Sequence, residues 1–107
     1  MSWVGDAEQL DADTVRLLEI TNHFLIAYFH HDSNEADRLI SEFLSASRYD
    51  EDFMHHESSF RLAAIIHYIH ALGGNPSSVG TWLLDQGYNI TPRDALEYFR
   101  EHYFRKP

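Results

Sequence analysis

Apolar residues recur at helical spacing along most of this 107-residue chain. Between Asp11 and His31 they fall at positions 15, 18, 25, 28 and 29, with a flanking stripe at positions 17, 20 and 24, as on the buried face of a helix. A second, shorter helix is predicted from an N-cap at Ser33 or Asn34 to about Ser47, because these side chains accept hydrogen bonds from free backbone N–H groups. We find no strand alternation of useful length and no internal repeat, so the pattern predicts an all-α fold.

A third helical region is expected after the link at residues 48–50 and runs to Leu72. It is apolar nearly all round after Phe60, which is typical of a central helix packed on several neighbours. We expect Ser58-Ser59 to kink this region or to split it. The sequence Gly73-Gly74-Asn75-Pro76 must end the helix, because glycine accepts the left-handed conformation and proline prevents continuation.

Two short helices are predicted beyond this break. Ser77 or Ser78 caps the first, and Gly87 closes it. The second begins at Thr91-Pro92, where a capping residue precedes a proline suited to the first helical position, and it ends near Arg105-Lys106. With 44% apolar and 14% aromatic residues, the chain can bury one core. We therefore expect one compact domain over residues 1–107, with four to five helices, two long and two to three short.

Negative charge is concentrated in the first half of the chain. The 17 acidic and 8 basic residues give a formal charge of −9. Up to Glu57 there are 13 acidic and 3 basic residues (−10), and from Ser58 onward there are 4 acidic and 5 basic residues (+1). This field repels nucleic acids and anionic membranes and attracts a basic protein surface. Solubility and favourable placement at helix starts also account for some of the carboxylates.

The lack of cysteine and of long apolar segments excludes several classes of protein. Without cysteine, there are no disulfides, thiolate metal sites or cysteine nucleophiles. The longest purely apolar stretches, such as residues 62–66, are far shorter than the roughly 20 residues that cross a bilayer. The first residues lack the pattern of a signal or transit peptide. We expect a cytoplasmic protein that does not bind membranes.

Eight histidines raise the question of a metal site. His67 and His70 have i, i+3 spacing, and Glu57 with His55 and His56 lies three turns earlier. This spacing matches neither the helical zinc-protease pattern nor the paired Glu-x-x-His pattern of di-iron bundles. We therefore expect no metal and no other cofactor.

Structural roles suffice for most of these histidines. His56 and His67 are expected to pack inside an apolar helix stripe, while helix dipoles favour the cations of His30, His31 and His70 near helix ends. So many groups that titrate near neutrality predict a broad pH response.

Catalytic and DNA-binding patterns are weak. No serine is flanked by the glycines of a nucleophile elbow, no glycine-rich loop carries the lysine of a phosphate site, and we expect no enzyme. Residues 82–98 fit a helix-turn-helix with Arg93 and Arg100 on its second helix. That helix also carries Asp94, Glu97 and Glu101, so it lacks the basic surroundings of a recognition helix.

The predicted partner site combines one tyrosine with nearby carboxylates. Tyr49 directly precedes an acidic run, and an aromatic anchor ringed by carboxylates suits a cationic target. The predicted partner-binding residues are Asp32, Glu35, Asp37, Tyr49, Asp50, Glu51 and Asp52.

Acidity and the absence of catalytic motifs predict a non-catalytic protein-binding module, as a monomer or weak homodimer. In general character the chain resembles immunity proteins, which are often small, acidic and without cysteine. This resemblance implies an inhibitor that neutralises a basic bacterial toxin, with a nuclease as the expected target, by occluding its active site. Two alternatives stay open: a metal-binding helical enzyme or sensor with His and Glu ligands, and a regulatory helix-turn-helix-like or scaffold protein.

Overall fold

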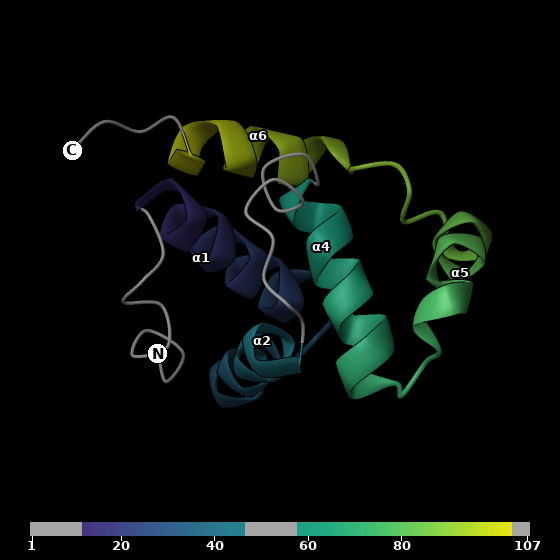
Figure 1. The fold of residues 1–107 in the computed structure, drawn as a ribbon. Helices are drawn as coiled ribbons and strands as arrows, with labels where there is room; N and C mark the ends of the chain where they lie inside the picture. The colour runs from purple at the N-terminus through teal and green to yellow at the C-terminus, as the bar shows by residue number, and fades with distance from the viewer. Residues whose placement is uncertain (1–11, 47–57, 104–107) are drawn as a thin grey trace.

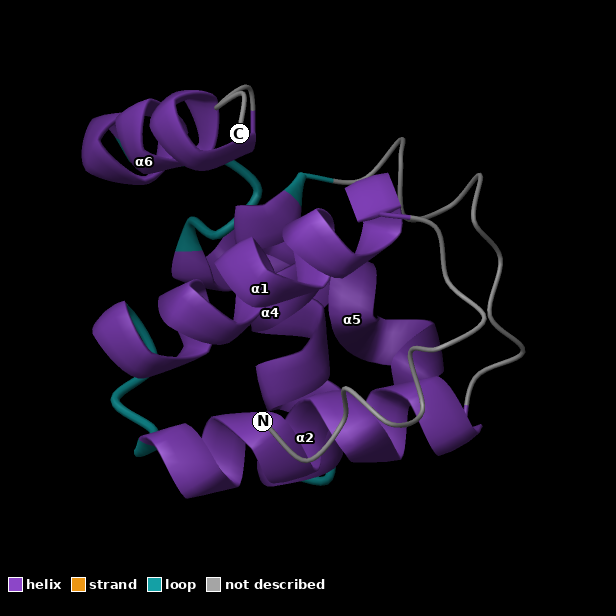
Figure 2. Cartoon of the chain, turned by 90° about the vertical axis from the view of Figure 1, so that its left-hand side faces the viewer, coloured by secondary structure: helices purple, strands orange, loops and turns teal. Residues whose placement is uncertain are grey.

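The computed structural model of the protein describes residues 12–46 and 58–103. Its α-helices are α1 (Ala12–Ala27), α2 (Ser33–Ala46), α4 (Ser59–Ile66), α5 (Val79–Gln86) and α6 (Arg93–Tyr103) (Figure 1). A π-helical turn follows α4 at His67–Ala71, and a 3₁₀ turn precedes α5 at Pro76–Ser78. Within the two described ranges there is no strand (Figure 2). The all-α prediction is therefore confirmed. The radius of gyration, 13.0 Å, is that of one compact domain of this size.

The connection from α1 to α2 sets where α2 begins. His30 has a left-handed backbone, with φ of 63°, and the N–H of His31 donates to the carbonyl of Leu25, six residues back, at 3.2 Å; this bond closes the chain after α1. Asp32 then caps α2, because its Oδ1 accepts from the N–H of Glu35 at 2.7 Å. The predicted caps Ser33 and Asn34 are wrong, since both lie inside the helix.

Helix α4 begins directly after Ser58, one of the two serines expected to interrupt the third helical region. The backbone of Ser58 is extended (φ −69°, ψ 148°), and its side chain caps α4 by accepting from the N–H of Arg61 at 3.1 Å. An α-helix does not run through an extended residue. The part of the third region before Ser58 lies outside the described residues, so the choice between a kink and a split stays a prediction.

The glycine-rich break ends the π-helical turn as expected. Gly73 is left-handed, with φ of 69°, and the N–H of Gly74 donates to the carbonyl of Tyr68 at 2.8 Å. Ser78, one of the two predicted caps, stands at the N-cap position of α5, but its side chain makes no capping hydrogen bond. Asn75 caps the 3₁₀ turn that precedes α5, where its Oδ1 accepts from the N–H of Ser77 at 3.0 Å.

Helix α4 is central, as its apolar pattern predicts. It packs against α1, α2 and α5, and Figure 1 shows α1 and α2 on one side of it and α5 on the other. The buried residues of this core are Leu18, Phe24 and Leu25 of α1, Leu39 and Ile40 of α2, Phe60, Leu62, Ala63, Ala64 and Ile66 of α4, and Leu83 of α5.

Helix α6 packs chiefly on α1. Ala95 is fully buried, and the ring of Tyr98 lies between two imidazoles: His23 on α1 at 3.8 Å and His102 on α6 at 3.7 Å between ring centroids. Arg16 Nη1 also donates to the carbonyl of Tyr103 at 2.9 Å. Helices α5 and α6, the pair of the helix-turn-helix alternative, thus pack on different helices of the fold.

None of the described helices combines the length and the apolar character that a bilayer crossing requires.

Candidate functional site at the junction of α2 and the π-helical turn

The π-helical turn is the most unusual backbone feature of the described chain. The N–H of Leu72 donates to the carbonyl of His67 at 3.0 Å, five residues back, whereas an α-helix bonds four residues back. Such turns are rare and frequently occur at functional sites. The turn packs against α2, so it brings its side chains to the surface that carries the predicted acidic residues.

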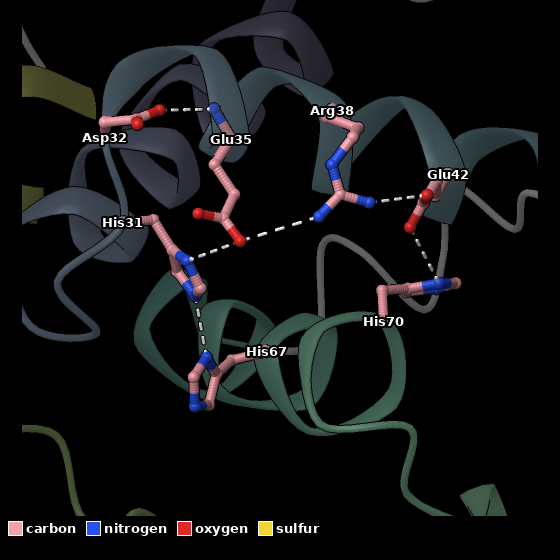
Figure 3. A network of polar contacts seen from close by, with 7 residues as sticks. All are labelled: His31, Asp32, Glu35, Arg38, Glu42, His67 and His70. Carbon is pink, nitrogen blue, oxygen red and sulfur yellow. Dashed lines mark hydrogen bonds and ion pairs between the residues drawn. The ribbon is translucent and has the colours of Figure 1, made fainter.

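Two histidines join the turn to the start of α2. Nε2 of His31 lies 2.8 Å from Nδ1 of His67 (Figure 3), and Nδ1 of His31 lies 3.5 Å from Oε1 of Glu35. The ring of His67 also stacks on Phe29, with 4.9 Å between centroids. At 2.8 Å, one of the two facing nitrogens must donate a proton and the other must accept it.

A chain of ion pairs continues along α2 from this histidine pair. Arg38 contacts Oε1 of Glu35 at 3.5 Å through Nη2 and Oε1 of Glu42 at 2.7 Å through Nη1. Oε2 of Glu42 lies 3.8 Å from Nδ1 of His70 (Figure 3). Because the side chains of Arg38 and Glu42 are about half exposed (53% and 43%), water screens these pairs, and we expect each to add little to stability.

Burial favours the neutral forms of the two histidines of the turn. Burial lowers the pKa of His67, the charge of His31 lowers it further, and Glu35 raises it less. Burial also lowers the pKa of His70; Glu42 acts to raise it and Arg38 to lower it. The lowered pKa of His70 runs against the prediction that a helix dipole favours its cation.

The structure places three of the predicted partner-binding residues. Asp32 is exposed and meets Glu35 through the cap described above. Asp37 instead turns towards α1, where its Oδ1 accepts from Nδ2 of Asn22 at 2.9 Å. The other predicted residues, Tyr49, Asp50, Glu51 and Asp52, lie outside the described residues.

No group of three or more metal-ligating side chains occurs in residues 12–46 and 58–103. His67 and His70, the pair with ligand-like spacing, meet two different partners on or beside α2 instead of converging. His55, His56 and Glu57, the other ligands considered, lie outside the described ranges. The described side chains thus do not identify a group that holds a metal or cofactor.

The spacing of residues in the sequence indicated part of this site. His31 and Glu35, and likewise Arg38 and Glu42, are four residues apart, a spacing that brings side chains together on a helix. The contact between His31 and His67 spans 36 positions, and no local pattern signals it. The π-helical turn was also missed, because the apolar pattern continues through it.

Comparison of the chain with protein-family models, with curated proteins and with solved structures gives no match.

Proposed function

We propose that this protein is a non-catalytic, acidic helical module that binds a basic partner protein in the cytoplasm. In concrete form, it is an immunity-type inhibitor that neutralises a bacterial toxin by covering its active site. A nuclease is the best-matched target, because a groove that binds nucleic acid is positively charged.

The proposal rests on the uneven distribution of charge along the chain. The chain has −10 up to Glu57 and +1 after it. The two described cations of the first half are already engaged within the fold: Arg16 with a backbone carbonyl, and Arg38 with Glu35 and Glu42. These two cations offset only a small part of the acidic excess, so the first half keeps its negative field.

Of the predicted partner-binding carboxylates that the structure describes, Asp32 suits a partner best. Asp32 is exposed and lies at the start of α2, whereas Glu35 already contacts Arg38. Asp37 contributes first to the packing of α2 on α1, through Asn22. In the proposed complex these residues and the acidic run Asp50-Glu51-Asp52 pair with Lys and Arg around the toxin's active site, and Tyr49 is the apolar anchor.

The proposal expects a basic toxin domain to be encoded beside this protein's gene, and the test uses that domain in a catalytically inactivated form. Binding is measured by calorimetry at low and high salt, and protection is measured by co-expression with the active toxin. Neutralising the acidic run by Asp50→Asn, Glu51→Gln and Asp52→Asn is expected to weaken binding at low salt by about tenfold or more, because steering and pairing are lost. Asp32→Asn adds to the loss while preserving the cap, since asparagine caps as well as aspartate.

A matched control removes the same number of charges from the second half of the chain. Asp85→Asn, Glu97→Gln and Glu101→Gln change three exposed carboxylates and are expected to leave binding nearly unchanged. Equal losses from the two triple variants, or a wild-type affinity indifferent to salt, would show that the acidic docking surface is wrong. Failure of the protein to protect cells from the toxin would exclude the inhibitor.

A further inference from the structure

We propose that His31 and His67 form a proton-operated latch that holds the start of α2 against the π-helical turn. The latch is closed while the pair carries at most one added proton, and it opens when both imidazoles are protonated. The 2.8 Å separation of Nε2 and Nδ1 is the basis, because two imidazolium rings present only N–H donors and cannot hydrogen-bond to each other.

The surrounding contacts assign the order in which protons bind. Glu35 lies beside Nδ1 of His31 at 3.5 Å, so when the pair holds one added proton, Nδ1–H of His31 faces the carboxylate and its Nε2–H donates to Nδ1 of His67. His67 is then the acceptor, and its remaining N–H is on Nε2. The second proton must bind Nδ1 of His67, next to a ring that already carries a charge, and this step breaks the bond.

Among the described residues, the groups packed around the pair do not offer His67 a compensating anion of its own. From α2, the nearest carboxylate is Glu35, which also contacts Arg38 at 3.5 Å. The chain after α1 contributes Phe29, and α5 contributes Trp82, whose ring centroid lies 6.4 Å from that of His67; neither ring ionises. Tyr88 packs on Phe29 at 5.1 Å, and the charged residue of α4 is the cation Arg61.

The contact of His70 with Glu42 determines which part of α2 is released by acid. It lies one turn further along, 3.8 Å from Glu42, with Phe43 at its ring edge and Arg38 as the other charged neighbour on α2. A proton on His70 is disfavoured by burial but faces the carboxylate of Glu42, so acid leaves this contact in place while it breaks the contact at His67. Acidification is therefore expected to release the first turn of α2 and to leave its second half attached to the π-helical turn.

Amide hydrogen exchange and ring-nitrogen NMR between pH 7.5 and 5.5 test the latch on the unmodified protein. His31 and His67 are expected to titrate in two coupled steps, with His67 the second. After correction for intrinsic rates, exchange of the amides of Glu35 and Ala36, which bond to Asp32, should rise about tenfold more than exchange within α4. Independent single-step titration of the two rings, or parallel exchange in α2 and α4, would overturn the proposal.

A pair of asparagine variants isolates the group responsible. His67→Asn places a non-titrating amide where Nδ1 lies, so the contact persists and the acid-dependent rise in exchange should disappear. His30→Asn removes the neighbouring, exposed imidazole, and asparagine tolerates the left-handed backbone there; it should behave as wild type. If His67→Asn does not fold, His31→Gln replaces Nε2 in the same way. Wild-type pH dependence in the folded variant would contradict the latch, which does not depend on the proposed partner.

Discussion

His23 and Tyr98 stack face to face, with their ring centroids 3.8 Å apart and their planes 2° apart. The contact joins α1 to α6, and His102 covers the other face of Tyr98. Nδ1 of His102 donates to the carbonyl of Tyr98 at 2.9 Å, since a carbonyl oxygen only accepts. Burial lowers the pKa of His23, and the charge of His102 lowers it further, so the stack favours a neutral ring at His23.

The first prediction is that acid destabilises the fold through its histidines. The pKa values of His23, His67 and His70 all lie below the ordinary value of 6.5, so the unfolded chain binds more protons. Their stabilising effect is fully present above pH 6.5 and is lost as the pH falls through their folded pKa values, by at most about 1.4 kcal/mol per pH unit for each histidine.

The variant His23→Phe tests this sign at one site. Phenylalanine keeps a ring on Tyr98 but does not titrate, so the difference in unfolding free energy between pH 7.5 and 5.5, measured with urea, should be smaller than in wild type. Acid also relieves the general negative repulsion, but it does so equally in both proteins. A larger loss on acidification in His23→Phe than in wild type would contradict the prediction.

The second prediction is that alanine destabilises the protein at Gly74 and stabilises it at Gly80. A Cβ at Gly74 would overlap the ring of Tyr68, whereas a Cβ at Gly80 meets nothing within 4 Å. Gly74→Ala should push Tyr68 off Trp82, with which it now packs at 4.6 Å, and cost about 1–3 kcal/mol. Gly80→Ala should stabilise α5 by about 0.5 kcal/mol. Urea unfolding followed by tryptophan fluorescence measures both, and equal effects would refute the predicted difference.

The third prediction concerns the bond between Asn22 and Asp37. Asn22 is buried (8% exposed), and its amide donates to a carboxylate across α1 and α2. Asn22→Ala should cost about 1.5–3 kcal/mol, as expected for a hydrogen bond to a charged group. Asp37→Asn keeps an acceptor oxygen and should cost less. Chemical denaturation of both variants and of the double variant gives the coupling energy, and additive losses would show that the two side chains do not interact.

The fourth prediction separates the charge of Asp32 from its role as a cap. Asp32→Ala removes the acceptor for the N–H of Glu35 and should cost about 1 kcal/mol, while Asp32→Asn should be nearly neutral. Ser58→Ala, which removes the cap of α4, is expected to cost a similar amount. Thermal unfolding measures these losses, and an equal loss in Asp32→Asn would mean that its charge, not its cap, stabilises α2.

Local signals predicted the helices well, and they failed where the chain offered several equivalent choices. Left-handed Gly73 and Gly87 and the serine at position 58 fixed helix ends that depend on one or two residues. The cap of α2 was misplaced by one or two residues, because neighbouring Asp, Ser and Asn side chains all cap well. The left-handed backbone at His30, a conformation that is uncommon outside glycine, decides between them.

The candidate site was less predictable, because its defining contact joins distant parts of the chain. The position of Glu35 on α2 followed from sequence, and its i, i+4 contact with His31 was within reach of the pattern. The turn of Asp37 towards Asn22 and the meeting of His31 with His67 depend on how α1, α2 and α4 pack. One sequence contains no local signal for that packing, and the pKa values that result from burial could not be foreseen either.

The π-helical turn has a consequence for how this chain tolerates length changes. A π turn contains about one residue more than an α turn, so deleting a single position from 67–71 would let α4 continue without interruption. Residues after the deletion would keep nearly their present positions around the helix axis, whereas a deletion within α4 would rotate them by about 100°. Deletion of Ile69 is therefore expected to keep His70 beside Glu42, and a one-residue deletion within α4 to separate the two and dismantle the polar junction beside α2.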